Sequence, residues 1–234
     1  MKAVSRRSFV GHAAAGIAVL ASPSVSADAE LFRPSDWKMG TFQSLLTQPF
    51  EAKQMFDVTA IDEGNALDHM VNSLNGLQVG FGVPASKIKI VGAFRGGASV
   101  LNFDDFAWEK FRLGELSKVD DPKTGKPATR NIYYPSAAGN PPKYTSTDPN
   151  DSASAMQDAS IQALQGRGVQ MLACHIAMEK YSGHIVKTLK LKQTEQEVFQ
   201  DLTNHLNPGV IVVPSMVSAI TMLQNKGQFA YTRN

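Results

Sequence analysis

Cysteine is almost absent from this chain of 234 residues, because Cys174 is the only one. An intrachain disulfide is therefore excluded, and so is haem attachment through a Cys-x-x-Cys-His motif. The stability of the fold has to come from its apolar core. A lone thiol is either buried and inert or kept for chemistry, and free cysteine is among the residue types most often found buried.

Metal-binding and phosphate-binding motifs are also missing. The histidines His69, His175, His184 and His205 are scattered, with no His-x-x-x-His pair and no Cys-x-x-Cys motif beside them. The glycine spacings of phosphate-binding and dinucleotide-binding loops do not occur either. We therefore expect no metal site and no cofactor.

The chain has no marked excess of charge of one sign. Lys2, Arg6 and Arg7 lie in an N-terminal segment without acidic residues, and the rest of the chain carries 20 basic against 21 acidic residues. A net charge of about −1 from residue 28 onward gives no basic face for nucleic acid or anionic lipid. We expect no nucleic-acid partner.

The first 27 residues have the parts of a twin-arginine (Tat) signal peptide. The run Ser5-Arg6-Arg7-Ser8-Phe9 is followed by a weakly apolar stretch at 13–20 and by Val25-Ser26-Ala27. The roughly 15 residues between Arg7 and Pro23 are fewer than the ~20 that span a bilayer. The sequence predicts export by the Tat translocase, cleavage after Ala27, a periplasmic location and no stable membrane insertion.

Strand and helix patterns alternate along the rest of the chain. Strands are expected at 55–61, 87–94, 169–173, 210–213 and 229–232, and helices at 65–78, 99–112, 153–165, 178–189, 194–205 and 216–225. Thr194 and Glu197 form a plausible capping box. This alternation predicts an α/β domain whose mainly parallel sheet is covered on both faces, with 88–94 and 210–213 at its centre.

Two segments differ from this pattern. Residues 28–52 carry apolar side chains that predict an arm packed on the domain, which itself spans 53–234. Residues 113–152 are rich in proline, glycine, asparagine and serine and cannot continue a helix or a central strand. Long connections of this kind are usually functional or disordered, and we interpret this one as a partly ordered inserted loop or flap.

Polar residues follow four of the expected strands, where ligands bind in open parallel sheets. They are Asp62 and Glu63 after the first strand, Arg95, Gly96 and Gly97 after the second, Cys174 and His175 after the third, and Ser215 after the fourth. A pocket built from them would favour an anionic or sulfur-bearing small molecule.

Each of these residues also has a structural interpretation. The Gly96-Gly97 pair after Arg95 is either an anion cradle or a tight turn. Cys174 is either a nucleophile assisted by the following helix start or a core residue.

The other two residues have structural roles of their own. His175 should point away from the thiol because neighbouring residues in a strand face opposite sides. Ser215 fits a helix N-cap better than a nucleophile, because no Gly-x-Ser-x-Gly elbow surrounds it.

The C-terminal part of the chain resembles the DsrE/DsrF-like family, in particular an exported, largely uncharacterised branch of it. The resemblance is carried by Gly166-Arg167-Gly168-Val169-Gln170-Met171-Leu172-Ala173-Cys174, by Pro208-Gly209-Val210-Ile211-Val212-Val213-Pro214-Ser215, and by Gly227-Gln228-Phe229-Ala230-Tyr231. It implies a three-layer α/β/α domain of about five strands that assembles into homo-oligomers. Some members relay sulfur as a cysteine persulfide, and Cys174 falls at the matching position. Relatives typically have glycine where Met216 stands, and the exported branch often has asparagine at the position of His175.

Two hypotheses follow from these observations. In the first, a periplasmic DsrE-like protein binds a small sulfur species or anion, with Cys174 as acceptor, Arg95 and the Gly96-Gly97 amides as anion contacts, and the flap as a lid. In the second, the chain is a non-catalytic oligomeric ligand-binding or structural module whose cysteine is part of the core.

Overall fold

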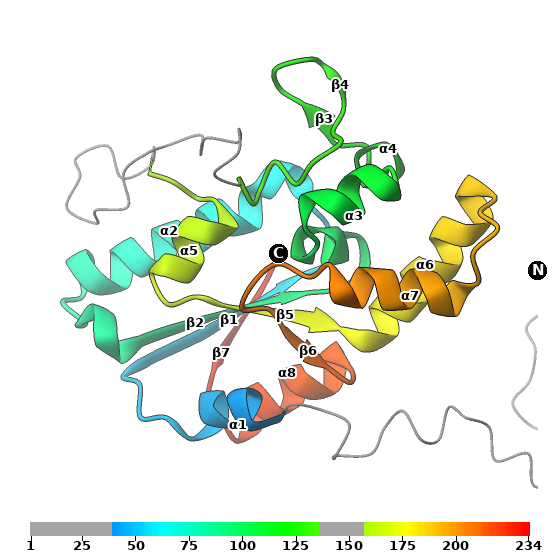
Figure 1. Ribbon diagram of the computed structural model, residues 1–234. Helices are drawn as coiled ribbons and strands as arrows, with labels where there is room; N and C mark the ends of the chain where they lie inside the picture. Colours follow the sequence, from blue (N-terminus) through cyan, green and yellow to red (C-terminus); the bar gives the residue numbers. More distant parts are fainter. Residues whose placement is uncertain (1–38, 136–156) are drawn as a thin grey trace, which may run out of the picture. The chain divides into compact units, whose positions relative to one another are not determined.

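The computed structural model describes residues 39–135 and 157–234 (Figure 1). The expected signal peptide, the first part of the arm, residues 136–152 of the expected flap and residues 153–156 of the helix expected at 153–165 lie outside the described residues. Within the described part, no helix combines the length and the apolar character that crossing a membrane requires.

A five-stranded sheet forms the centre of the domain. Its strands are β1 (Ala52–Val58), β2 (Ile88–Phe94), β5 (Gln170–Cys174), β6 (Ile211–Val213) and β7 (Ala230–Arg233). They lie in the order β6-β5-β2-β1-β7, and every neighbouring pair is parallel. The predicted α/β class with a parallel sheet is confirmed.

The position of β6 differs from the prediction. Its apolar residues led us to expect it at the centre of the sheet, but it is an edge strand. Ile211 packs into the apolar cluster on one face of the sheet and Val212 into the cluster on the other. Its hydrophobic character therefore reflects helices on both faces, and only β5 is its strand neighbour.

Helices cover both faces of the sheet, which gives three layers (Figure 1). One face carries α1 (Met39–Thr47) and α8 (Met216–Asn225), and Phe42, Leu45 and Leu46 of the expected arm are buried there. The other face carries α2 (Asn65–Asn75), the 3₁₀ helix η6 (Gly96–Asn102), α3 (Asp105–Lys110), α4 (Leu113–Ser117), α5 (Ile161–Gly166), α6 (His175–Leu189) and α7 (Glu195–Asn204).

Two predicted helices are shorter than expected because serine and aspartate caps begin them late. The helix expected at 99–112 is interrupted at Phe103, which forms an isolated bridge with Leu206, and α3 starts only after Asp104. The Asp104 carboxylate accepts a hydrogen bond from the Ala107 amide at 3.0 Å. In the same way, Ser160 caps α5, so this helix begins at 161, and residues 157–160 of the expected helix are not helical.

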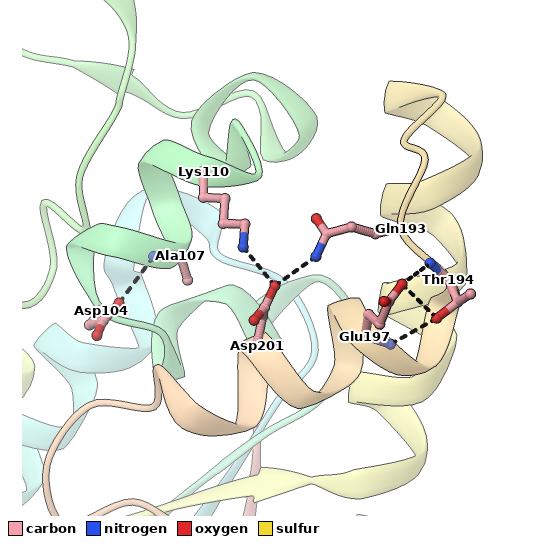
Figure 2. A network of polar contacts seen from close by, with 7 residues as sticks. All are labelled: Asp104, Ala107, Lys110, Gln193, Thr194, Glu197 and Asp201. Atoms are coloured by element: carbon pink, nitrogen blue, oxygen red, sulfur yellow. Dashed lines mark hydrogen bonds and ion pairs between the residues drawn. The ribbon is translucent and has the colours of Figure 1, made fainter.

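Surface polar contacts link α3 to α7 (Figure 2). The Lys110 ammonium lies 2.7 Å from Asp201 Oδ2, to which Gln193 Nε2 also donates a hydrogen bond at 3.0 Å. The capping box predicted from Thr194 and Glu197 is present at the start of α7. Exposed contacts of this kind add little stability each, so the apolar residues beneath them hold the two helices together.

Part of the expected flap is packed against the domain. It contains α4 and a short hairpin of β3 (Asp120–Asp121) and β4 (Lys126–Pro127). The fully buried Asn131 anchors the following segment, because its Nδ2 donates to the carbonyl oxygens of Leu101 at 3.0 Å and Phe103 at 2.8 Å. Gly114 supports the hairpin directly, since an added Cβ would lie 2.1 Å from the Ala128 carbonyl oxygen.

We predict that Gly114→Ala destabilises the protein by about 2–3 kcal/mol, because the new methyl group meets backbone atoms that cannot move independently. The measurement is the free energy of unfolding in urea. Gly166→Ala is the matched control, since nothing lies within 4 Å of its Cβ position, and its effect should stay within about 0.5 kcal/mol. Equal effects of the two substitutions would show that the hairpin does not pack on Gly114.

Candidate functional site

The ends of β1, β2 and β5 bring three polar side chains to one face of the sheet. Alternate residues of a strand share a face, and Met55, Ala93 and Leu172 all pack in the cluster beneath α1 and α8. Asp57, Arg95 and Cys174 each lie two residues further along their strands and therefore point to the same side. The last registered pair of β2 and β5 is Phe94 with Ala173, so Arg95 and Cys174 are the next neighbours along this edge.

Cys174 lies at the starts of two helices. It is the last residue of β5 and occupies the N-cap position of α6. Its Sγ accepts a hydrogen bond from the amide of Met216, the first residue of α8, at 3.3 Å. The thiol is free, and Cys174 as a whole residue is 6% exposed. Helix N-termini carry partial positive charge, so the sulfur is buried but has a polar environment on one side.

Arg95 forms a bidentate ion pair with Asp57. Nε lies 2.7 Å from Oδ1, and Nη2 donates to Oδ2 at 2.8 Å. The Tyr231 hydroxyl of β7 also donates to Oδ2 at 2.8 Å. Asp57 is only 2% exposed, so these three donors replace the water that an ionised carboxylate would otherwise require.

The charges at this edge influence one another. Burial by itself raises the pKa of Asp57, but hydrogen bonds from Arg95 and Tyr231 and the charges of Arg95 and Arg233 outweigh it and hold the pKa below its usual value. The pKa of Arg95 is raised, first by its hydrogen bond to Asp57 and then by the charge of that carboxylate, which together outweigh the opposing effect of burial.

The glycines after Arg95 allow a close approach of two chain segments. Gly96 has φ +58, and a Cβ there would lie 3.1 Å from the Thr59 carbonyl oxygen. The same oxygen accepts the Ala98 amide at 3.3 Å. The Gly96-Gly97 pair therefore has a structural role as a tight turn into η6. Its role as an anion cradle stays a prediction.

His175 and Ser215 occupy different surroundings. The His175 ring is buried with its edge against Phe199 of α7, 4.8 Å between centroids, and its Nε2 lies 3.2 Å from Glu179 Oε1. The structure thus places His175 between α6 and α7 and does not bring it to the thiol face. Ser215 is at the N-cap position of α8 but makes no side-chain capping bond. It directly precedes the amide that contacts Cys174.

Two of the polar residues that follow the expected strands, Asp62 and Glu63, line a cavity beside α2. The others do not line it: Arg95, Gly96, Gly97, Cys174, His175 and Ser215. That cavity has a volume of about 780 Å³ and is bounded by residues 61–64, α2 and the hairpin region. No group of three or more His, Cys, Asp or Glu side chains among the described residues is arranged to hold a metal ion.

Asp57 and Tyr231 are site residues that the sequence analysis did not single out. The sequence holds a signal for Asp57, because this aspartate stands within an apolar strand. When helices cover both faces of the sheet, a carboxylate in such a strand is buried and requires a partner. No comparable signal marks Tyr231, which belongs to a short edge strand and is 43% exposed.

We predict that Arg95→Met lowers the free energy of unfolding by about 2–3 kcal/mol, because it leaves the buried Asp57 carboxylate without its cation. Lys110→Met is the matched control, since Lys110 and Asp201 are also 2.7 Å apart but the carboxylate there is 28% exposed. We expect the control to cost less than about 1 kcal/mol. In a double-mutant cycle with Asp57→Asn, additive effects would show that the pair is not coupled.

The stability that Asp57 contributes should disappear in acid. Its folded-state pKa lies below the ordinary value of 3.8, so its contribution is complete above that pH and is lost as the pH falls through the lower folded value. We expect the stability difference between the native chain and Asp57→Asn to be constant near neutral pH and to shrink below about pH 4. Urea unfolding at a series of pH values measures it, and a difference independent of pH would contradict this assignment.

Comparisons with protein-family models, with curated proteins and with solved structures find no match for this chain. The resemblance to the DsrE/DsrF-like family therefore rests on the sequence runs quoted above. The observed five-stranded parallel sheet between two helical layers has the architecture that this resemblance implies.

Proposed function

We propose that this protein binds a small sulfur species or anion at the C-terminal edge of its sheet and carries sulfur on Cys174. The observation that supports this best is the position of the thiol. Its Sγ accepts the Met216 amide at the start of α8 while Cys174 itself begins α6. Backbone amides at helix starts favour negative charge, which both a thiolate and a persulfide carry.

The proposed chemistry is a transfer of sulfane sulfur from a persulfide or polysulfide donor. The Cys174 thiolate attacks the terminal sulfur of the donor, and a new sulfur–sulfur bond forms as the donor's own sulfur–sulfur bond breaks. The donor leaves as a thiolate or a shorter polysulfide and takes the proton that Cys174 gave up. No external oxidant or reductant is required, because one persulfide replaces another.

Arg95 contributes positive charge to this site. Its ion pair with Asp57 uses Nε and Nη2, and within the described part of the chain Nη1 makes no hydrogen bond. Because Asp57 compensates much of the guanidinium charge, the role of Arg95 is to orient a ligand beside the sulfur, and strong attraction of distant anions is not expected from it.

The burial of Cys174 restricts what can react with it. Because the Cys174 residue is only 6% exposed, the site admits a thin polysulfide chain more readily than a bulky disulfide. The proposed ligand is therefore small and linear.

The cellular setting is part of the same proposal. We propose that the chain is exported through the Tat pathway to the periplasm and forms a homo-oligomer there, as a DsrE-like protein. The twin-arginine run and the quoted family runs support this setting. A dedicated sulfur donor or acceptor would then be another exported protein or a small polysulfide.

We predict that incubation with inorganic polysulfide adds sulfur to the native protein and that Cys174→Ser abolishes the addition. Intact-protein mass spectrometry measures the added mass, and a reducing agent should remove it. Because Cys174 is the only cysteine, the signal has a single origin. Absence of added sulfur under conditions that modify a control thiol would contradict the proposal.

Thiol labelling in the native state separates the proposal from the interpretation of Cys174 as a core residue. Iodoacetamide should label Cys174 in the folded protein, whereas an aromatic disulfide reagent should react at least about tenfold more slowly, because the sulfur is nearly enclosed. Labelling by neither reagent until the protein unfolds would assign Cys174 to the core.

A further inference from the structure

A cavity of about 780 Å³ opens beside the start of α2. One wall is the connection from β1 to α2 together with the first turn of α2, and the opposite wall is the segment from the end of α4 into the β3–β4 hairpin. Figure 1 shows this hairpin rising next to α4 and the beginning of α2. The volume lies within the range of small-molecule sites, about 300–1,000 Å³.

The two walls carry side chains of opposite charge. Asp62, Glu63 and Asp68 lie on the α2 wall, and Lys118 and Lys123 on the hairpin wall. None of these five side chains takes part in a salt bridge within the described residues. Arg130 also lines the cavity, but its guanidinium is paired with Asp121 at 2.9 Å. The hairpin wall further includes the carboxylate of Asp120.

Apolar side chains and one phenol also line the cavity. Ile61, Leu67, Val119 and Ile132 line the cavity together with Tyr133. The Tyr133 ring lies against Gly64, where an added Cβ would come within 3.0 Å of it. Burial, together with the charge of Glu63, raises the pKa of Tyr133 to about 12, so its hydroxyl is a neutral hydrogen-bond donor at physiological pH.

The acidic wall is held in an unusual backbone conformation. Asp62 and Glu63 have φ values of 43° and 52°, and Gly64 follows with φ 93°. Consecutive non-glycine residues in the left-handed region are unfavourable, and such conformations persist mainly at functional sites. The Asp62 carboxylate is further oriented by the Asn65 side-chain amide, which donates to it at 2.9 Å.

We propose that this cavity binds a small zwitterion, such as a free amino acid or a short peptide. Its ammonium group would contact the Asp62–Glu63–Asp68 wall, and its carboxylate would contact Lys118 and Lys123. A simple anion would be repelled by the acidic wall and a simple cation by the lysines, whereas a neutral ligand would leave charges of both walls without partners.

This proposal does not depend on the chemistry of Cys174, which does not line the cavity. The Cys174→Ser variant should therefore bind the zwitterion as the native chain does. Loss of sulfur uptake and loss of zwitterion binding are separate results, so each proposal can fail alone.

The experiment compares ligands that differ by one charge. Glycine, glycylglycine and triglycine carry both charges at increasing separation, whereas glycylglycinamide lacks the carboxylate and N-acetylglycylglycine lacks the ammonium group. We expect at least one of the three zwitterions to bind, measured by isothermal titration calorimetry, about tenfold or more tightly than either singly charged analogue, as expected for the loss of one charged hydrogen bond. Equal binding of all ligands, or no binding of any zwitterion at about 10 mM, would overturn the proposal.

Substitutions on each wall identify the contacts. Glu63→Gln and Lys118→Gln should each weaken binding of the preferred zwitterion by about tenfold. Glu63→Gln should not weaken binding of N-acetylglycylglycine, because this anion has no ammonium group and is repelled by the acidic wall. Both residues are exposed, so the fold should be retained, which thermal unfolding checks. Glu51→Gln and Lys187→Gln make the same chemical changes outside the cavity and should bind normally. If the wall variants behave like these controls, the cavity is not the site.

Discussion

The carboxylate of Asp57 is the constraint on which this edge of the sheet depends. An ionised carboxylate at 2% exposure is stable only when donors surround it, and here they come from Arg95 after β2 and from Tyr231 in β7. One side chain of β1 therefore joins three neighbouring strands at their C-terminal ends. Because the guanidinium is held over Asp57, its position relative to the end of β5 is also determined. The environment of Cys174 thus depends on an ion pair that does not include it.

The sequence predicted elements whose signals are local. The apolar run of β2, the helical spacing of α8 and the capping box of α7 are each written in a few consecutive residues, and each appears in the structure. The interrupted helix at 99–112 shows the opposite case, because the apolar spacing continues across Phe103 and hides the stop that Asp104 and the bridge to Leu206 create. The edge position of β6 was not predictable in this way, because strand order depends on contacts between distant segments. An edge strand that helices cover on both faces has the same apolar sequence pattern as a central strand.

The candidate site, too, was predictable where its signals are local and not where it depends on contacts between distant segments. The rule that ligands bind beyond the C-terminal ends of parallel strands places Arg95 and Cys174 on one edge, but only the register of β2 with β5 shows that they are neighbours on one face. His175 lies elsewhere because it is the first residue of α6 and its ring packs against Phe199 of α7. The cavity beside α2 could not be derived from sequence, because its walls come from segments about 55 residues apart whose approach depends on the buried anchor Asn131 and on Gly114.

Alternation along the strands gives this sheet edge two chemically different sides. On the side of α1 and α8, Arg95 and Asp57 nearly cancel each other's charge, so the positive potential at the sulfur arises mainly from backbone amides at the starts of α6 and α8. Such a potential acts over a short range, so it stabilises a negative charge only on the sulfur or on an atom in direct contact with it. On the side of α2, the charges are carried by exposed side chains that no salt bridge among the described residues neutralises, so they act over a longer range. A ligand of the proposed site at Cys174 would therefore be selected by its size and by the charge on the atom that touches the sulfur, whereas a ligand of the proposed cavity site would be selected by the separation of its charges.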